Sequence, residues 1–331
     1  MSAKILITGE TFLSNNVDIL KQKGYDIEVR TKHLDEDALV DALTGKDVYI
    51  LGGVETATAG AIKRTNGLKI IAVMGTGYQS FVDADAATQK GIVITNTPNT
   101  NSRAVAEMTI GFMLSMRRKI SFINHLTKTG GWRDDIVSKN LHGQTLGIIG
   151  MGAIGSIVAE IAHNGLGMNI VYHSRSPKPV IEERVKAKKV TLEKLLSQSD
   201  FVSLHCPTTQ ETTHMVGELQ FKMMKKTAIL VNNARPQVVE PNALYTALKE
   251  GYIAGCAMDG YYSEPAPSPE NDSYGLLNLP DEIFLVSSHL AYLTEDSIQK
   301  MCDLATTSVI NVLEGKEDKH IVNPEYKNFQ E

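Results

Sequence analysis

Three ionisable side chains that could transfer protons and stabilise charge each follow a short apolar run late in the chain. They are Arg235, Glu264 and His289. Arginine is always charged and can bind a carboxylate through its planar fork, while histidine exchanges a proton near neutral pH and a neighbouring glutamate favours its protonated form. Because a doubly wound sheet gathers the carboxyl ends of its strands at one edge, we expect these side chains to form one site.

A glycine-rich turn separates a strand-like run from a helix-like run near the middle of the chain. After the apolar run 146–149 the sequence reads Gly150-x-Gly152-x-x-Gly155. The first glycine permits a tight turn, the second lets backbone approach a pyrophosphate, and the third allows close packing of helix on strand. Free N–H groups at the helix start bind phosphate. The pattern predicts dinucleotide binding, with these candidate residues: Gly150, Gly152, Ala153, Ile154 and Gly155.

The next strand-like run, 169–173, ends without the acidic residue that usually binds the ribose hydroxyls of NAD. In its place the chain presents His173, Ser174 and Arg175. A hydroxyl and a guanidinium suit a 2′-phosphate, which a carboxylate would repel. The sequence therefore favours NADP(H). The alternative is NAD(H), bound through ribose hydroxyls and backbone groups, with Arg175 as a solvated loop residue.

Short strand-like runs alternate with longer helical patterns along the whole chain, which predicts an α/β fold with parallel sheets. The expected strands of the first hundred residues are 4–7, 47–51, 68–73 and 92–94. The expected strands of the second series, which would complete a doubly wound domain, are 146–149, 170–172, 201–204, 228–231, 254–258 and 283–286. Helical spacing of apolar residues predicts long helices over 103–118 and 294–313.

Length and composition limit the possible classes of protein. At 331 residues, the chain is about twice the roughly 150 residues expected of one domain. Hydrophobic residues make up 42% and charged residues 21%, and the net charge is −5, so neither nucleic acid nor a membrane surface is an expected partner. The scattered Cys206, Cys256 and Cys302 predict neither disulfides nor a metal site. Without a signal-like or membrane-spanning segment, we expect a cytoplasmic protein.

Several ordered motifs together closely resemble the D-isomer-specific 2-hydroxyacid dehydrogenases, with glyoxylate/hydroxypyruvate reductases and D-lactate dehydrogenases among the candidate relatives. The resemblance covers nearly the whole chain. The motifs are Gly75-Thr-Gly77-Tyr78, Asn96-Thr-Pro98, Gly131-Trp132, the glycine turn, His205-Cys206-Pro207, Asn232-x-Ala234-Arg235, Asp259-x-x-x-x-Glu264 and His289.

The resemblance implies two domains and a reaction. A Rossmann doubly wound parallel sheet domain would span 102–290, and a smaller flavodoxin-like α/β substrate domain would combine 1–101 with 291–331. The implied enzyme reduces small 2-oxo acids to D-2-hydroxy acids by hydride transfer from NAD(P)H. Arg235 would hold the substrate carboxylate and polarise the carbonyl, and His289, paired with Glu264, would be the acid/base.

The resemblance also implies further contacts and a homodimer. Cofactor contacts would come from His205, Cys206, Pro207, Thr212, Asn233, Ala234 and Asp259, together with Arg235 and His289. The implied substrate contacts are Arg235, His289, Tyr292 and backbone N–H groups of the loop that begins Met74-Gly75. For Asp259, a purely structural role in its loop is the alternative.

The chain departs from the family pattern at two positions. Pro236 stands where relatives have glycine and should hold Arg235 in an extended conformation, while Ser288 stands where proline commonly precedes the histidine.

Two alternative functions are compatible with the same fold. One is a nucleotide-sensing, corepressor-like binding protein. The other is a formate dehydrogenase-like enzyme, although those relatives have glutamine where this chain has Glu264. Glyoxylate, hydroxypyruvate and pyruvate all remain candidate substrates.

Overall fold

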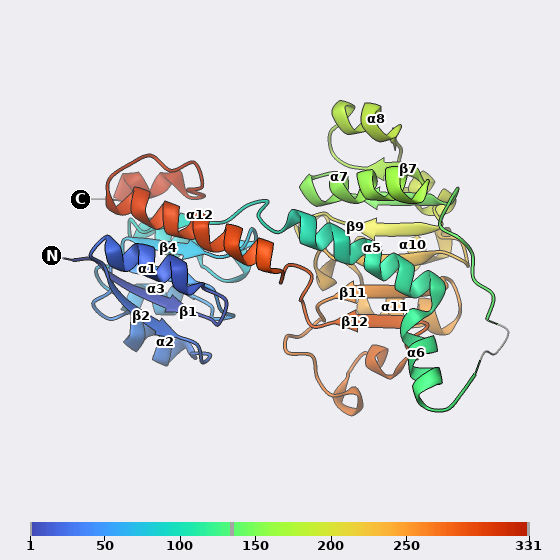
Figure 1. The fold of residues 1–331 in the computed structure, drawn as a ribbon, viewed down its shortest axis with the longest axis horizontal. Coiled ribbons are helices and arrows are strands. Elements are labelled where there is room, and N and C mark those ends of the chain that lie inside the picture. Colours follow the sequence, from blue (N-terminus) through green and yellow to red (C-terminus); the bar gives the residue numbers. More distant parts are fainter. Residues whose placement is uncertain (1, 133–135, 330–331) are drawn as a thin grey trace. The chain divides into compact units, whose positions relative to one another are not determined.

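A computed structural model describes residues 2–132 and 136–329 of the chain. The chain divides into two compact units (Figure 1). One contains the residues up to Asn101 and those from Leu293 onward, and the other is Ser102–Tyr292. Each unit has its own parallel sheet, so the predicted α/β class is confirmed.

The first unit is built on a five-stranded sheet of order β2-β1-β3-β4-β5, all parallel. This is the flavodoxin-like strand order. Its strands are β1 Lys4–Thr8, β2 Asp26–Arg30, β3 Val48–Leu51, β4 Ile70–Val73 and β5 Val93–Thr95. Helices α1 Ser14–Gln22 and α12 Glu295–Leu313 pack on one face of the sheet. The other face is covered by α2 Glu36–Leu43, α3 Ala59–Arg64 and α4 Ala84–Gln89.

Strand β2 is the strand of this unit that the sequence prediction missed. Its sequence, Asp-Ile-Glu-Val-Arg, alternates polar and apolar residues, and none of the five is fully buried. The four predicted strands, by contrast, are apolar runs buried on both faces. β2 lies at an edge of the sheet, and its charged residues interrupt the continuous apolar run that β5, at the other edge, retains.

The second unit contains a seven-stranded parallel sheet of order β12-β11-β10-β9-β6-β7-β8. If these strands are numbered 1 to 7 along the chain and read from the β8 edge, the order is 3-2-1-4-5-6-7. This is the doubly wound dinucleotide-binding order 3-2-1-4-5-6 with one further strand, β12. Six strands match the predicted runs, and the seventh, β8, consists of two exposed lysines that carry no apolar signal. The strands are β6 Thr145–Ile149, β7 Asn169–His173, β8 Lys188–Lys189, β9 Phe201–Leu204, β10 Ile229–Asn232, β11 Gly255–Asp259 and β12 Phe284–Ser287.

Helices cover both faces of this larger sheet. One face packs against α5 Ser102–Arg118, α7 Ala153–Glu160 and α8 Pro179–Val185. The opposite face packs against α9 Leu192–Gln198, α10 Glu218–Met223 and α11 Pro241–Lys249. The remaining helix, α6 Ile120–Lys128, has no buried residue.

Parallel pairing brings the carboxyl ends of all seven strands to the same edge, marked by the arrowheads in Figure 1. The residues that directly follow β6, β9 and β10 there are Gly150, His205 and Asn233.

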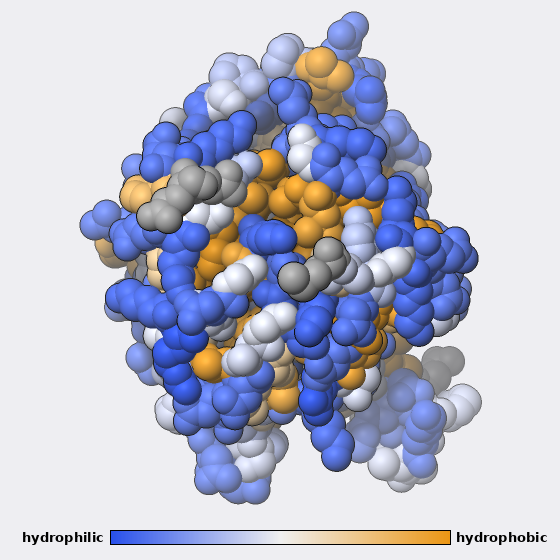
Figure 2. Space-filling view, turned by 90° about the vertical axis from the view of Figure 1, so that its left-hand side faces the viewer, coloured by the Kyte–Doolittle hydropathy of each residue, from blue (hydrophilic) through white to orange (hydrophobic). Residues whose placement is uncertain are grey.

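Hydrophilic residues cover most of the face drawn in Figure 2, with apolar residues grouped near its centre. Across the described part of the chain, no helix is both long and apolar enough to span a membrane.

Candidate active site

His289 and Glu264 form a hydrogen-bonded pair at the carboxyl edge of the larger sheet. His289 Nδ1 lies 3.0 Å from Glu264 Oε2, and both side chains retain partial solvent exposure. Glu264 follows β11 and His289 follows β12, which are neighbouring strands. A Cβ on Gly260 would lie 2.5 Å from Glu264 Oε1, so glycine leaves room for this carboxylate. With Nδ1 engaged, Nε2 is the ring nitrogen left for proton exchange.

The loop that carries His289 is held by the buried carboxylate of Asp259. Asp259 Oδ1 accepts hydrogen bonds from Leu290 N–H, at 2.8 Å, and from the Ser287 hydroxyl, while Oδ2 accepts from Ala291 N–H at 2.9 Å. His289 itself has a left-handed backbone, with φ of 59°. This conformation is uncommon for a residue other than glycine. The three hydrogen bonds that Asp259 accepts from neighbouring residues hold the loop in it.

Tyr292 packs against this pair. Its ring meets that of His289 edge to face, with the centroids 6.0 Å apart. Burial raises the pKa of the Tyr292 phenol, and the nearby carboxylates of Asp259 and Glu264 raise it further. Tyr292 is therefore a neutral aromatic wall beside the imidazole.

Arg235 lies just beyond β10, the strand next to β11. Its backbone is extended, with φ of −143° and ψ of 141°, which confirms the conformation predicted from Pro236. Asn232 fixes this turn, because its Nδ2 donates to the Arg235 carbonyl and its Oδ1 accepts from Ala234 N–H. The half-buried guanidinium donates to the Ala234 carbonyl and forms no ion pair with any described residue.

The glycine turn has the geometry of a phosphate-binding loop. Gly150 has φ of 98°, and a Cβ there would lie 2.6 Å from the carbonyl carbon of His205. A Cβ on Gly155 would lie 2.3 Å from the Gly150 carbonyl oxygen, so only glycine lets α7 start this close to the strand. Around Gly152, the N-cap of α7, a Cβ would meet no described atom within 4 Å. Space and free N–H groups beside Ala153 and Ile154 therefore suit a pyrophosphate.

Buried polar atoms without partners lie beside this turn. His205 Nδ1 and both side-chain amide atoms of Asn233 have no hydrogen-bond partner among described residues. The pairing of Leu204 with Asn232 places these two residues at adjacent strand ends. Burial lowers the pKa of His205 to about 3, so its ring is neutral, with Nε2 2.8 Å from the Ser203 hydroxyl. Buried polar groups are normally hydrogen-bonded, so these atoms fit the hydroxyl and amide groups of a nicotinamide nucleotide.

The other predicted residues of this edge line the same region. Burial raises the pKa of the Cys206 thiol, which favours its neutral form. Thr212 closes the following turn, because its hydroxyl donates to the Pro207 carbonyl at 2.6 Å. Cys206 packs against the buried cluster on this face of the sheet, and Thr212 supports the turn.

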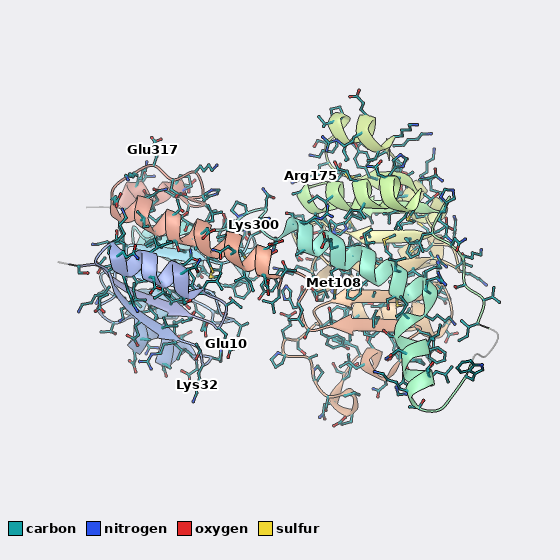
Figure 3. All side chains as sticks on the ribbon, viewed as in Figure 1. Glu10, Lys32, Met108, Arg175, Lys300 and Glu317 are labelled. Atoms are coloured by element: carbon teal, nitrogen blue, oxygen red, sulfur yellow. The ribbon has the colours of Figure 1, made fainter. Side chains whose placement is uncertain are left out.

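The loop after β7 presents three polar side chains, and one carboxylate, Glu193, interacts with the first of them, His173. His173 Nδ1 lies 3.2 Å from the Val190 carbonyl, and the Ser174 hydroxyl donates to the Ser176 carbonyl at 2.7 Å. Arg175 is exposed and has no acidic partner among described residues. Figure 3 shows it on the side of this domain toward which the strand arrows point.

The predicted substrate loop belongs to the first unit and follows β4. Met74 N–H donates to the Leu51 carbonyl at 2.9 Å, and Gly75 N–H lies 3.0 Å from the Val73 carbonyl. The amides of Thr76 and Gly77 have no hydrogen-bond acceptor among described residues. The donors that this loop offers a ligand are therefore those two amides rather than those of Met74 and Gly75.

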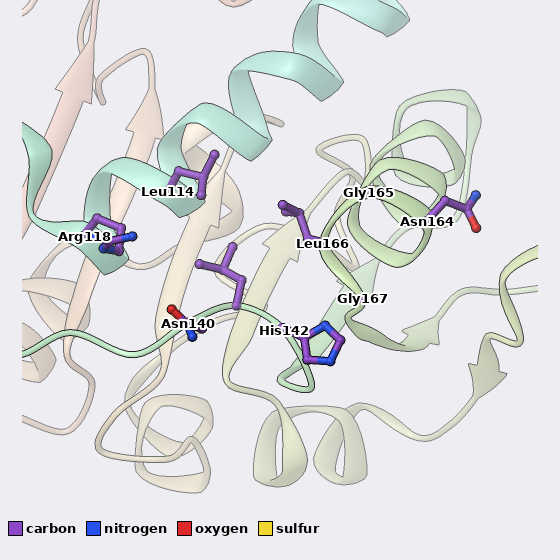
Figure 4. Close-up of a pocket in the computed structure, with 9 residues that line it drawn as sticks. Leu114, Arg118, Asn140, His142, Asn164, Gly165, Leu166 and Gly167 are labelled. Carbon is purple, nitrogen blue, oxygen red and sulfur yellow. The ribbon is translucent and has the colours of Figure 1, made fainter.

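A separate surface hollow of about 500 Å³ lies in the second unit and contains none of the predicted site residues (Figure 4). Leu114 and Arg118 of α5 form one wall, and His142 and Leu166 contribute to others. A second hollow of about 620 Å³ shares Leu114 and Arg118 and extends along α6.

Sequence reasoning assigned no positioning role to Asn232, Ser287 or Lys189. Asn232 makes two hydrogen bonds within its own turn, while Ser287 and Lys189 each make one, to a carboxylate and to a main-chain carbonyl. No spacing pattern signals such a bond, since its partner is distant in sequence or is a main-chain atom that every residue has. No described group of three or more His, Cys, Asp or Glu side chains is placed to hold a metal ion.

Comparison with known proteins identifies similar sequences and structures. Residues 110–291 match the family model described as the NAD binding domain of D-isomer specific 2-hydroxyacid dehydrogenases. The glyoxylate reductase of Thermococcus litoralis is 34% identical over 98% of this chain and 97% of its own. A solved protein of Thermus thermophilus is 31% identical, with a TM-score of 0.86 over 96% of this chain and 99% of that one. The D-lactate dehydrogenase of Escherichia coli is 25% identical, with a TM-score of 0.84 over 96% and 99%.

Proposed function

Since the chain belongs to the D-isomer-specific 2-hydroxyacid dehydrogenase family, we propose that it reduces small 2-oxo acids to D-2-hydroxy acids with NADPH or NADH. It is an enzyme of the class that acts on CH–OH groups. The observation that carries the proposal is the His289–Glu264 pair, which shares one sheet edge with Arg235 and the glycine turn. In this proposal residues 102–290 bind the dinucleotide, and residues 1–101 and 291–331 form the substrate domain.

The chemistry of reduction assigns a task to each polar group. The nicotinamide cofactor, when bound, supplies the hydride. His289 Nε2 gives a proton to the carbonyl oxygen, while Glu264 accepts the Nδ1–H bond and orients the ring for that transfer. Arg235 binds the substrate carboxylate through its fork and stabilises the negative charge that develops on the carbonyl oxygen. In the oxidising direction, neutral His289 removes the hydroxyl proton.

The residues that would hold the cofactor follow the carboxyl edge of the sheet. The N–H groups at the start of α7 bind the pyrophosphate, and the amide of Asn233 with Nδ1 of His205 bonds the nicotinamide nucleotide. Ser174 and Arg175 bind a 2′-phosphate, so NADP(H) is the preferred cofactor and NAD(H) the weaker one.

Tyr292 favours substrates with a small substituent, because its ring stands edge to face against the imidazole that must reach the carbonyl. Glyoxylate, pyruvate and hydroxypyruvate meet this requirement. The relatives named above, a glyoxylate reductase and a D-lactate dehydrogenase, have names that refer to two small acids of this kind.

The deciding experiment measures oxidation of NADPH and of NADH with each of these three acids, and the configuration of the product. We expect turnover with at least one acid, a D product and a higher kcat/KM with NADPH. His289→Ala should lower kcat by about 10²- to 10⁴-fold while nucleotide binding persists. Nucleotide binding without any turnover would favour the sensing protein, and oxidation of formate would favour the formate dehydrogenase.

Cofactor preference has its own test in Arg175→Ala. The variant should weaken NADPH binding by about tenfold and leave NADH binding nearly unchanged, because one charge-assisted contact to the 2′-phosphate is lost. An equal effect on the two nucleotides would exclude Arg175 from phosphate recognition.

We also propose a homodimer formed through the face of α6. Its apolar Ile120 and Ile123 are 53% and 39% exposed, and Trp132 and Val137 beyond it are 75% and 93% exposed. A second copy would cover these side chains, which a monomer leaves in water. Light scattering on the wild type should give twice the chain mass of 36.2 kDa, and Ile123→Glu should give a monomer; a monomeric wild type would exclude the dimer.

A cytoplasmic setting completes the proposal. Cys206, Cys256 and Cys302 are all unpaired thiols in the structure. Free thiols are the usual state of cysteine in reducing compartments.

A further inference from the structure

We propose that Lys189, on strand β8, is a second cation of the 2′-phosphate site and therefore a determinant of NADP(H) preference. This inference rests on the proposed function, in which Arg175 recognises that phosphate. It adds a residue from a different strand, 14 positions further along the chain. Neither the glycine turn nor the sequence of the 173–178 loop points to it.

The placement of Lys189 follows from the pairing of β8 with β7. Lys189 lies opposite Tyr172 in the parallel register. Two further bonds tie the strands together beyond that point, from Val190 N–H to the Tyr172 carbonyl at 2.9 Å and between His173 Nδ1 and the Val190 carbonyl at 3.2 Å. The end of β8 therefore lies directly beside the first residues of the 173–178 loop.

The ammonium group of Lys189 reaches that loop. Its Nζ lies 3.4 Å from the carbonyl oxygen of Arg175. The same three-residue turn is closed by the hydrogen bond from the Ser174 hydroxyl to the Ser176 carbonyl. The ammonium of Lys189, the guanidinium of Arg175 and the hydroxyls of Ser174 and Ser176 thus belong to one short stretch of surface.

Three carboxylates on helices α7, α8 and α9 have partners of their own, and no described carboxylate forms an ion pair with Lys189. Glu182 accepts hydrogen bonds from the Tyr172 hydroxyl and from Lys178 N–H. Glu160 pairs with Arg184. Hydrogen bonds to its own backbone and to the Thr191 hydroxyl lower the pKa of Glu193, and the imidazole of His173 lowers it further. Among described residues, the Arg175 carbonyl is the one polar partner of the Lys189 ammonium group, so most of its charge is left for a ligand.

A phosphate monoester explains why two cations would be placed here. It carries about −1.5 to −2 charges near neutral pH, more than a single arginine balances. Arginine supplies a directional fork and lysine a compact point charge, so the two are complementary. A ribose 2′-hydroxyl gains little from either, and the effect of Lys189 should therefore fall on NADP(H) alone.

The test compares Lys189→Ala with Lys188→Ala, since the two lysines are adjacent on β8 and successive strand residues point to opposite faces. Dissociation constants are measured for NADPH and NADH, and for adenosine 2′,5′-bisphosphate and 5′-AMP as probes of the phosphate alone. We expect Lys189→Ala to weaken NADPH and the bisphosphate by about fivefold to tenfold and the other two by less than twofold. Lys189→Arg should restore most of the loss.

The possible failures are distinguishable. If Arg175→Ala selectively weakens NADPH but Lys189→Ala behaves like Lys188→Ala, Lys189 is not part of the site and the proposed cofactor preference stands. If the wild type binds NADPH no better than NADH and Arg175→Ala changes nothing, the proposed preference fails, and the role of Lys189 fails with it. NADH binding by every variant serves as the check that the domain is folded.

Discussion

His289 Nδ1 lies 3.0 Å from Glu264 Oε2, so the orientation of the imidazole is set by a carboxylate that follows a different strand. The contact is charge-assisted when the ring is protonated. It holds the ring in one orientation and leaves Nε2 for the substrate.

Replacing that charge should slow the reaction. Glu264→Gln keeps a hydrogen-bond acceptor but loses the charge-assisted contact that orients the imidazole. We expect kcat for reduction to fall by about tenfold while nucleotide binding is unchanged. Steady-state rates and nucleotide titration of the two proteins would show the difference.

Glu270→Gln provides the matched control for this prediction. Glu270 is exposed in the same loop region and has no ion-pair partner among described residues. Its replacement should leave kcat unchanged. Equal kcat values for Glu264→Gln and the wild type would contradict the role of Glu264 in orienting His289.

Asp259 should act on the reaction through the loop that bears His289. In Asp259→Asn, one of the three donors would face an amide N–H instead of an oxygen. We expect stability to fall by about 1–3 kcal/mol and kcat to fall more than tenfold, with KM for the nucleotide nearly unchanged. Ser287→Ala, which removes a single donor, should have a smaller effect on kcat. A loss confined to nucleotide affinity would instead indicate direct contact with the cofactor.

Two glycines of the phosphate loop should respond differently to alanine. At Gly155 the added Cβ would lie 2.3 Å from a backbone oxygen, so Gly155→Ala should destabilise the domain by a few kcal/mol. At Gly152 it would meet no described atom within 4 Å, so Gly152→Ala should unfold like the wild type yet bind nucleotide at least tenfold more weakly. Urea unfolding and nucleotide titration separate the two effects. Unchanged affinity in Gly152→Ala would show that no pyrophosphate approaches this position.

Asp200 should make stability depend on pH in the acid range. Burial raises the pKa of its carboxyl, but the bond from Thr145 N–H and the ion pair with Lys225 outweigh burial and lower the pKa below its ordinary value. A lowered carboxyl pKa stabilises the fold at neutral pH and ceases to do so as the pH falls through it. Asp200→Ala should therefore cost on the order of 2 kcal/mol at pH 7 and progressively less below pH 4. A cost that stays constant across this range would show that the charge of Asp200 does not contribute.

Much of the fold follows from local patterns. The four buried strands predicted for the smaller sheet and the six for the larger one all occur, because continuous apolar runs bounded by turn residues identify strands buried on both faces. The two strands that were missed, β2 and β8, are edge strands rich in charged residues. Their positions depend on pairing with a neighbour, which no local pattern encodes.

By itself the sequence determined the α/β class, the glycine turn and the identity of the family, because these depend on residue types at fixed spacing along the chain. Only the tertiary structure decided which groups touch. Strand order and register bring together His289 and Glu264, which are 25 residues apart. They also place Asp259 within hydrogen-bond distance of a loop some 30 residues away, and Lys189 beside Arg175. The physical reason is that parallel pairing brings strand ends together whatever their separation in the chain, so contact distances are a property of the folded sheet.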